Sequence, residues 1–218
     1  MSNGISIVKG ILWVLVWFGF MIFYTVLDIL IWRKIAPEQS RFLNLITVAI
    51  CMAIFLNLLV TKTNFKLRLF SNISFLGIVL ALGCSVLFYF LLDKGLDPLF
   101  EDLFPSSKEN YQQIIRLIQI SPIVSFFDFC ILAPILEEVL MRGFLLDGLS
   151  INYGKIVALL ISAAFFSILH FNIAQIVPSF ICGILLGLLY FYTDSIFSCI
   201  LAHMGYNAIS YMIILSKL

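Results

Sequence analysis

Long apolar runs separated by short polar segments dominate the pattern of hydrophobic and polar positions along the chain. A helix needs about 20 apolar residues to cross a bilayer, and runs of about this length recur from one end of the sequence to the other. They predict an all-α, polytopic transmembrane bundle of about seven helices, over residues 11–32, 41–61, 73–92, 122–146, 155–170, 173–192 and 195–215. The polar stretch 93–119 is predicted to be the longest connection between two crossings.

We interpret residues 1–218 as a single membrane domain, because the sequence shows neither an internal repeat nor a low-complexity linker. Its ionisable residues within apolar runs gather in the C-terminal half, so we expect its chemistry there. The helices within 1–95 carry no motif. Basic residues flank both ends of the second predicted crossing, so the positive-inside rule gives equal weight to both orientations.

The composition confirms the membrane class and excludes others. The chain is 62% hydrophobic and 11% charged, whereas about a quarter of the residues of a soluble domain are charged. We therefore expect a multi-pass protein of the cell membrane, with the lipid bilayer as its surroundings. The net charge is +1 without a basic stripe, which argues against nucleic acid as a partner. The five cysteines lie singly in apolar runs, which is typical of small buried hydrophobes rather than disulfides or metal ligands.

Two carboxylates and a guanidinium lie inside the fourth apolar run, at Glu137, Glu138 and Arg142. Each charge at the centre of a bilayer costs roughly 2.5–3.5 kcal/mol, so such residues indicate a functional site. Glu138 and Arg142 are four residues apart and can form an ion pair on one helix face. Glu137 points about 100° away from its neighbour. We therefore predict a structural role for Glu138 and a chemical role for Glu137, which is free to face a cavity.

The chain has only two histidines, His170 and His203, and each lies in or at the end of an apolar run. Phe166 precedes His170 by four residues and Asn207 follows His203 by four, so each pair shares a helix face. A single histidine at a helix end is usually an interfacial or packing residue. Together with the buried glutamate, however, these polar side chains on three predicted helices indicate a site between helices.

Three motifs occur in order, each on its own predicted helix. They are Glu137-Glu138-x-x-x-Arg142, Phe166-x-x-x-His170 and His203-x-x-x-Asn207. They resemble the motifs of the CPBP family, the CAAX-protease and bacteriocin-processing (Abi) intramembrane endopeptidases, which includes the type II CAAX prenyl endopeptidases. The resemblance covers roughly residues 120–215. It implies that Glu138, Arg142 and Phe166 support the site.

The resemblance also implies a role for each of the other matched residues. Glu137 and His170 would activate a water molecule that attacks the scissile carbonyl. His203 and Asn207 would form the site that stabilises the oxyanion. Fixed donors stabilise an oxyanion far better in a low-dielectric site than in water.

A metal site is the main alternative to this mechanism. Two histidines and a glutamate can hold zinc with one open position, and Glu137, His170 and His203 would then be the ligands. The chain has no HExxH spacing, and its histidines lie on separate predicted helices. We therefore expect neither a metal nor another cofactor.

The function expected from the resemblance is hydrolysis of a peptide bond in a membrane-associated protein or peptide. The substrate would be a CAAX-type tail, or a bacteriocin or pheromone precursor. The short chain with a plain N-terminal half resembles the bacterial members, which favours a precursor. The alternative is a non-enzymatic bacteriocin self-immunity membrane protein, although this chain keeps every matched residue. A proton-coupled carrier is a third alternative, but carriers usually show repeats in both halves.

Overall fold

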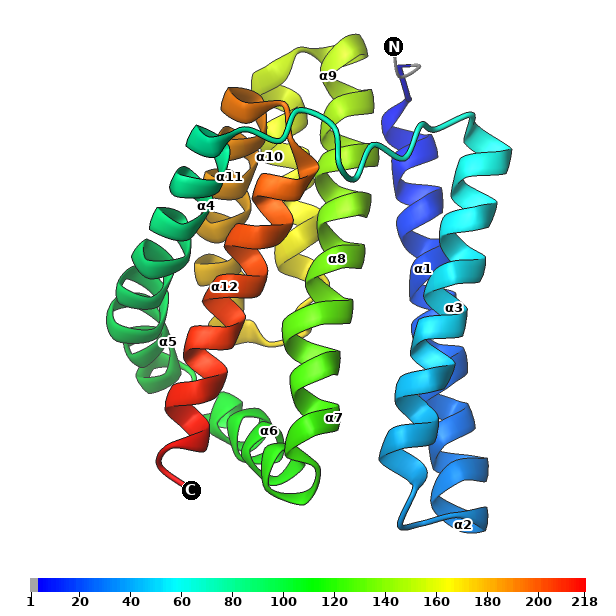
Figure 1. Ribbon diagram of the computed structural model, residues 1–218, viewed down its shortest axis with the longest axis vertical. Helices are drawn as coiled ribbons and strands as arrows, with labels where there is room; N and C mark the ends of the chain where they lie inside the picture. Colours follow the sequence, from blue (N-terminus) through cyan, green and yellow to red (C-terminus); the bar gives the residue numbers. More distant parts are fainter. Residues whose placement is uncertain (1–3) are drawn as a thin grey trace.

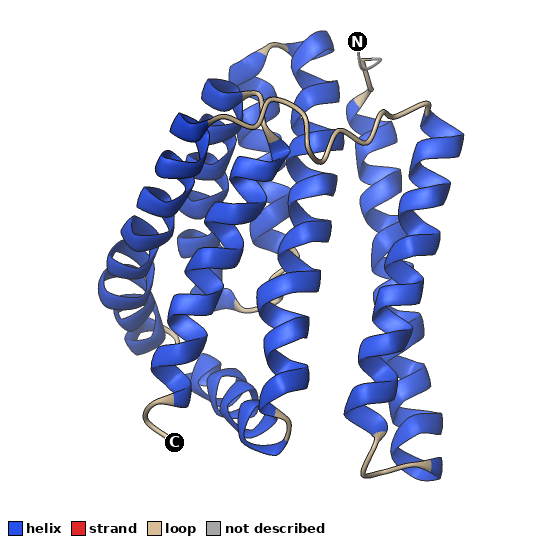
Figure 2. Cartoon of the chain, viewed as in Figure 1, coloured by secondary structure: helices blue, strands red, loops and turns tan. Residues whose placement is uncertain are grey.

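The computed structural model describes residues 4–218, and these residues form helices and loops without a strand (Figures 1 and 2). Five helical stretches are long and apolar enough to cross a membrane: Ile7–Ile35, Ser40–Thr63, Phe75–Leu103, Ile173–Thr193 and Ile196–Leu215. The all-α transmembrane bundle predicted from the apolar runs is thereby confirmed.

The fourth and fifth predicted crossings are helical as well. Successive helical turns run from Pro122 to Tyr153 as α7 (Pro122–Phe126), η4 (Phe127–Leu132), α8 (Ala133–Glu138), η5 (Val139–Leu146) and α9 (Asp147–Tyr153). We call these turns the motif helix. It carries Glu137, Glu138 and Arg142 near its middle. The next helix, α10 (Lys155–Ile168), is short and apolar.

Parts of the motif helix are wound as π-helix, in which an N–H donates to the carbonyl five residues earlier rather than four. The π-helical stretches are η4 and η5, which flank the glutamate pair on both sides. Every residue of η5 is buried. Wider turns of this kind are frequent at functional sites, and here they shift the faces on which the following residues lie.

The N-terminal hairpin consists of α1 (Ile7–Leu27) with its extensions η1 (Asp28–Trp32) and α2 (Arg33–Ile35), and of α3 (Ser40–Thr63). It stands beside the other helices, in blue and cyan in Figure 1. Trp13 joins it to the motif helix, because its ring lies 6.0 Å from that of Phe55 and 6.4 Å from that of Phe144. A loop then crosses one end of the molecule to α4 (Figure 1).

The third crossing is longer than the sequence predicts. After α4 (Phe75–Phe88) the chain continues as η2 (Tyr89–Leu96) and α5 (Asp97–Leu103), where a polar connection was expected from residue 93. That prediction was wrong because the polar side chains here face a neighbouring helix. Asp93 accepts hydrogen bonds from Tyr206 (2.7 Å) and Ser210 (2.5 Å). The connection itself is reduced to η3 (Pro105–Ser107) and α6 (Lys108–Ile120).

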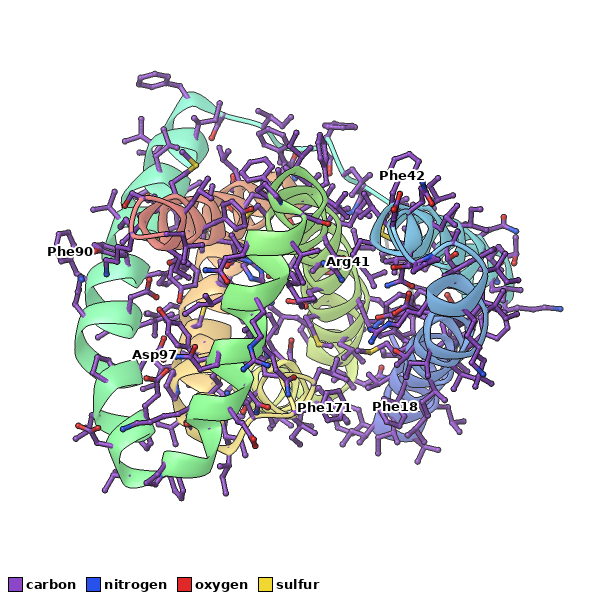
Figure 3. All side chains as sticks on the ribbon, turned by 90° about the horizontal axis from the view of Figure 1, so that it is seen from below. Phe18, Arg41, Phe42, Phe90, Asp97 and Phe171 are labelled. Atoms are coloured by element: carbon purple, nitrogen blue, oxygen red, sulfur yellow. The ribbon has the colours of Figure 1, made fainter. Side chains whose placement is uncertain are left out.

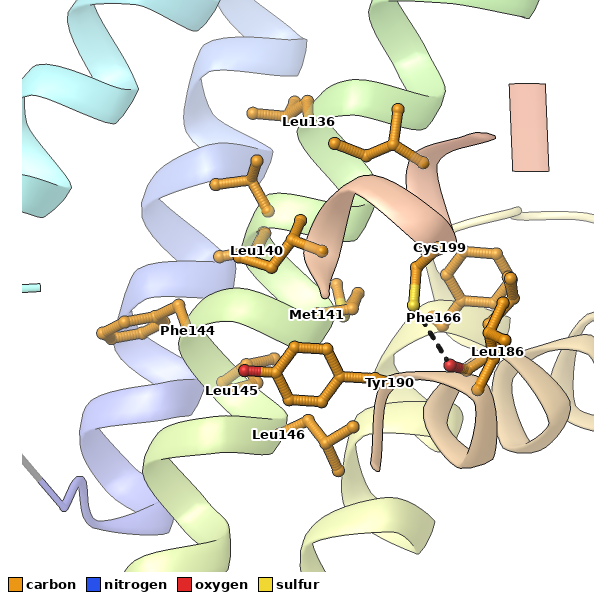
Figure 4. Close-up of a cluster of buried hydrophobic side chains, with 14 of the residues drawn as sticks. Leu136, Leu140, Met141, Phe144, Leu145, Leu146, Phe166, Leu186, Tyr190 and Cys199 are labelled. Carbon is orange, nitrogen blue, oxygen red and sulfur yellow. Dashed lines mark hydrogen bonds between the residues drawn. The ribbon is translucent and has the colours of Figure 1, made fainter. Parts of the chain in front are cut away.

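After α10 the chain forms the short η6 (Ile173–Gln175), α11 (Ile176–Thr193) and α12 (Ile196–Leu215). The hydrophobic core surrounds η5 and is formed by α10, α11 and α12. Figure 4 shows its buried side chains, among them Leu140, Met141, Leu145, Leu186 and Tyr190. A glycine lets α10 and α11 approach closely, because a Cβ at Gly183 would lie 3.0 Å from the Cα of Ala163. This core fixes the helices that carry the three motifs.

Candidate active site

A cavity of about 530 Å³ lies between the motif helix, the third crossing and α10, α11 and α12. The four predicted catalytic side chains all line it: Glu137, His170, His203 and Asn207. They come from the motif helix, from the turn that follows α10 and from α12, and 70 residues separate the first from the last (207 − 137). The structure thus brings together the residues that the motifs singled out.

Glu138 and Arg142 form the ion pair predicted from their spacing, with 2.9 Å between Arg142 Nη1 and Glu138 Oε1. Both residues are 0% exposed, so water does not screen this pair. A second guanidinium nitrogen, Nη2, donates to the Gly183 carbonyl on α11 at 3.1 Å. A buried charge is tolerated only when it is paired and hydrogen-bonded, and this pair ties the motif helix to α11.

His203 joins the same cluster through a contact that the sequence did not predict. Its Nδ1 lies 2.9 Å from Glu138 Oε1. A carboxylate that is paired with a guanidinium only accepts hydrogen bonds, so His203 Nδ1 is the donor in this contact. The other ring nitrogen, Nε2, is 3.9 Å from Glu137 Oε2. The contact with Glu138 thus orients the imidazole so that Nε2 is directed at Glu137.

The second histidine is oriented by its own helix. His170 follows the end of α10, and its Nδ1 lies 2.8 Å from the carbonyl oxygen of Phe166. A carbonyl only accepts hydrogen bonds, so Nδ1 carries the proton here as well. In the neutral ring Nε2 then has a lone pair, which can accept a hydrogen bond.

Phe166 contacts all three charged or titratable side chains around it. The Arg142 guanidinium lies 4.6 Å from the centre of its ring, which is a cation–π distance. The imidazoles of His170 and His203 lie 4.9 Å and 5.6 Å from the same ring, both edge to face. Phe166 thus packs against both imidazoles, and the supporting role predicted for it stays a prediction.

Asn207 is anchored rather than free. Its Nδ2 donates to the backbone carbonyl of Phe129 in η4, at 2.9 Å. The carbonyl can only accept, so the nitrogen of the amide must face it. One N–H of the amide is used in this way, and the second N–H remains for a ligand in the cavity.

Sequence reasoning missed the acidic end of the cavity, which is lined by Asp93, Asp97 and Glu101 of the third crossing. Figure 3 shows Asp97 on the inner side of that helix, towards the other helices. These residues were assigned to a polar connection. The available signal was their spacing of four residues, which places all three on one helix face.

Two aspartates of the helical stretches, Asp28 and Asp128, do not line the cavity. Asp28 forms an ion pair with Arg33 at 2.7 Å. The N-terminal hairpin also reaches the motif helix through Arg41, whose Nη2 donates to Ser125 Oγ at 3.3 Å. Figure 3 shows Arg41 on the side of the hairpin that faces the motif helix.

Within residues 4–218, no three His, Cys, Asp or Glu side chains come together in an arrangement that could hold a metal ion. Glu137, His170 and His203 line one cavity, but both Nδ1 atoms are engaged by protein acceptors. The expectation of a metal-free site stays a prediction.

Comparison with known proteins addresses the same part of the chain. The family described as type II CAAX prenyl endopeptidase Rce1-like matches residues 119–209, a segment that contains all seven motif residues. Neither a curated protein nor a solved structure shows a match to the chain. The resemblance predicted from the three motifs is confirmed: over residues 119–209 this chain matches the type II CAAX prenyl endopeptidase Rce1-like family of membrane proteases.

Proposed function

We propose that this protein is a glutamate-type intramembrane endopeptidase that hydrolyses a peptide bond of a membrane-associated protein or peptide. The observation that carries the proposal is one cavity wall shared by Glu137, His170, His203 and Asn207. Acid–base groups and hydrogen-bond donors thus surround a space that can hold a peptide. The five apolar spans support a location in the cell membrane.

The first step of the proposed reaction is the activation of water. The Glu137 carboxylate takes a proton from a water molecule, and the lone pair of His170 Nε2 accepts its other hydrogen as a hydrogen bond. The water oxygen attacks the scissile carbonyl carbon, where a new C–O bond forms as the C=O π bond breaks. Positioned general bases contribute typically 10²–10⁴-fold to such a step.

The tetrahedral intermediate carries a negative oxygen, which requires donors. The second N–H of Asn207 is available, because the first donates to Phe129. His203 donates from Nε2 only when the ring is protonated, since its Nδ1–H is used on Glu138. The C–N bond then breaks, and the proton held by Glu137 passes to the leaving amine.

The substrate we propose is a CAAX-type tail or a bacteriocin or pheromone precursor. The family description supports the first. The size of the cavity, about 530 Å³, fits a short peptide segment better than a folded protein, because ligand pockets of 300–1,000 Å³ enclose small ligands. Apolar side chains such as Leu92, Ile114 and Phe129 in the lining favour a membrane-embedded segment.

The test compares wild type with Glu137→Gln, which removes the base and keeps the shape of the side chain. Both are expressed in a host that lacks the gene, and membrane-derived and secreted peptides are profiled by mass spectrometry. A cleaved peptide is expected to disappear with Glu137→Gln and to persist with Glu38→Gln, an exposed glutamate of the N-terminal hairpin. An unchanged peptide profile would contradict hydrolysis and favour the non-enzymatic self-immunity alternative.

A further inference from the structure

The Phe129 carbonyl lacks a backbone donor, for a reason that lies in the sequence. In η4 the N–H of Ala133 donates to the carbonyl of Asp128, five residues earlier. In the same register the next N–H, at position 134, would donate to Phe129. Residue 134 is a proline, which has no N–H. Pro134 therefore leaves the Phe129 carbonyl without its partner in the helix.

The vacant position is filled from another helix. Asn207 on α12 donates its side-chain N–H to this carbonyl at 2.9 Å, across 78 residues of sequence. Phe129 is partly buried, and a carbonyl that is withdrawn from water requires a donor. Pro134 on the motif helix thus withholds a backbone donor from the Phe129 carbonyl, and Asn207 on α12 supplies a side-chain donor in its place.

We propose that Pro134 is a positioning residue for Asn207. By withholding an N–H from Phe129, it gives the Asn207 amide a fixed acceptor and so directs the second N–H of that amide at the cavity. The importance of this for catalysis rests on the oxyanion role proposed for Asn207. The anchoring itself does not, and it can be measured without a substrate.

The substitution Pro134→Ala tests the anchoring because it changes the motif helix in two ways. It restores an N–H, and it removes the ring that clashes with the preceding turn of a regular α-helix. The motif helix can then close its backbone hydrogen bonds and draw the Phe129 carbonyl away from α12. Because proline in a helix interior is destabilising, Pro134→Ala is expected to keep or raise the thermal unfolding midpoint. Any loss it causes at the site is then separate from unfolding.

The matched control is Pro122→Ala. Pro122 is exposed at the first position of α7, where an N–H has no partner within the helix. The substitution also keeps the Pro122 carbonyl, which accepts a hydrogen bond from Tyr211. It therefore changes a proline of the same helix without changing any backbone bond that reaches the site.

The first experiment is NMR of the full chain in lipid nanodiscs with ¹⁵N-labelled asparagine, the Asn207 signal being assigned by its loss in Asn207→Ala. In wild type one Nδ2 proton should exchange slowly with solvent. We expect its exchange to become at least tenfold faster in Pro134→Ala and to stay within twofold in Pro122→Ala. Unchanged exchange in Pro134→Ala would overturn the proposal.

The second experiment is a double-mutant cycle on the peptide whose cleavage depends on Glu137. Pro134→Ala should lower kcat about tenfold with KM within twofold, and it should change kcat less than twofold in the Asn207→Ala background. Independent, additive effects would overturn the proposal while leaving the endopeptidase intact. If Asn207→Ala alone keeps full activity, the oxyanion role of Asn207 fails, and the NMR result still decides the anchoring.

Discussion

The N-terminal hairpin and the C-terminal helices are both apolar, but they use their apolar surface differently. In the most apolar window of each hairpin span, Ile7–Ile35 and Ser40–Thr63, 17% of the residues are buried. In Ile173–Thr193 the share is 50%. The hairpin therefore turns most of its side chains to lipid, whereas the C-terminal helices pack around a buried ion pair and a cavity. We expect equivalent substitutions to have very different consequences in the two regions.

The largest contrast should come from removing one partner of an ion pair in each region. Glu138→Ala leaves the Arg142 charge buried and unpaired, which costs about 3–5 kcal/mol, and it removes the acceptor that orients His203. We expect a large fall in the thermal unfolding midpoint and loss of peptide cleavage.

Asp28→Ala is the counterpart in the hairpin. Its partner Arg33 has a side chain that is 60% exposed, so the remaining charge stays hydrated. A smaller loss of stability and activity within about twofold of wild type are expected. Equal losses of activity in the two variants would mean that the hairpin also shapes the site.

Replacing a glycine by alanine in each region should change the stability of the protein by an intermediate amount. The added Cβ of Gly183→Ala meets the backbone of Ala163 at 3.0 Å and forces α10 and α11 apart, which moves the carbonyl bound by Arg142. Overpacking of this kind costs typically 1–3 kcal/mol. Gly19→Ala on α1 meets nothing within 4 Å, and alanine is the better helix former by about 1 kcal/mol. Thermal unfolding should therefore show a lower midpoint for Gly183→Ala and a higher midpoint for Gly19→Ala.

A smaller effect is expected where the two regions meet. Arg41→Ala removes one hydrogen bond of 3.3 Å to Ser125, which contributes about 0.5–1.5 kcal/mol. Peptide cleavage should stay within twofold of wild type, because neither residue lines the cavity. A fall in kcat of more than tenfold would show that the docking of the hairpin controls the site.

No effect is expected from metal removal. Both histidines use Nδ1 on protein acceptors, and the proposed steps require only proton transfers and hydrogen bonds. Incubation with 1,10-phenanthroline should leave cleavage unchanged. Loss of activity that returns with added zinc would instead favour the site with Glu137, His170 and His203 as ligands.

Much of the fold was readable from the sequence because each crossing is long and apolar. The Glu138–Arg142 pair was also readable, since it needs only helical spacing. The extension of the third crossing to Leu103 was not, because Asp93 is polar and its partners Tyr206 and Ser210 lie more than 100 residues later. A polar residue bonded across a helix interface resembles a loop residue until its partner is known.

The four residues predicted to be catalytic line one cavity and their roles stay predictions, but their contacts could not be predicted from the sequence. The hydrogen bond between Glu138 and His203 joins two helices, and helical spacing describes only one helix at a time. The anchor of Asn207 depends on the π-helical register of η4, which a regular period of 3.6 residues does not contain. The division of the chain into one domain with a core at 120–215 stays a prediction.

The central claim is that Glu137 performs acid–base chemistry at a site that Glu138 and Arg142 hold in place. The most direct test measures kcat and the thermal unfolding midpoint of purified wild type and Glu137→Gln in proteoliposomes, on the peptide identified by profiling. We predict a loss of kcat of about 10²-fold or more with an unchanged midpoint, because Glu137 is not part of the buried ion pair. Cleavage at the wild-type rate by a folded Glu137→Gln protein would contradict the account.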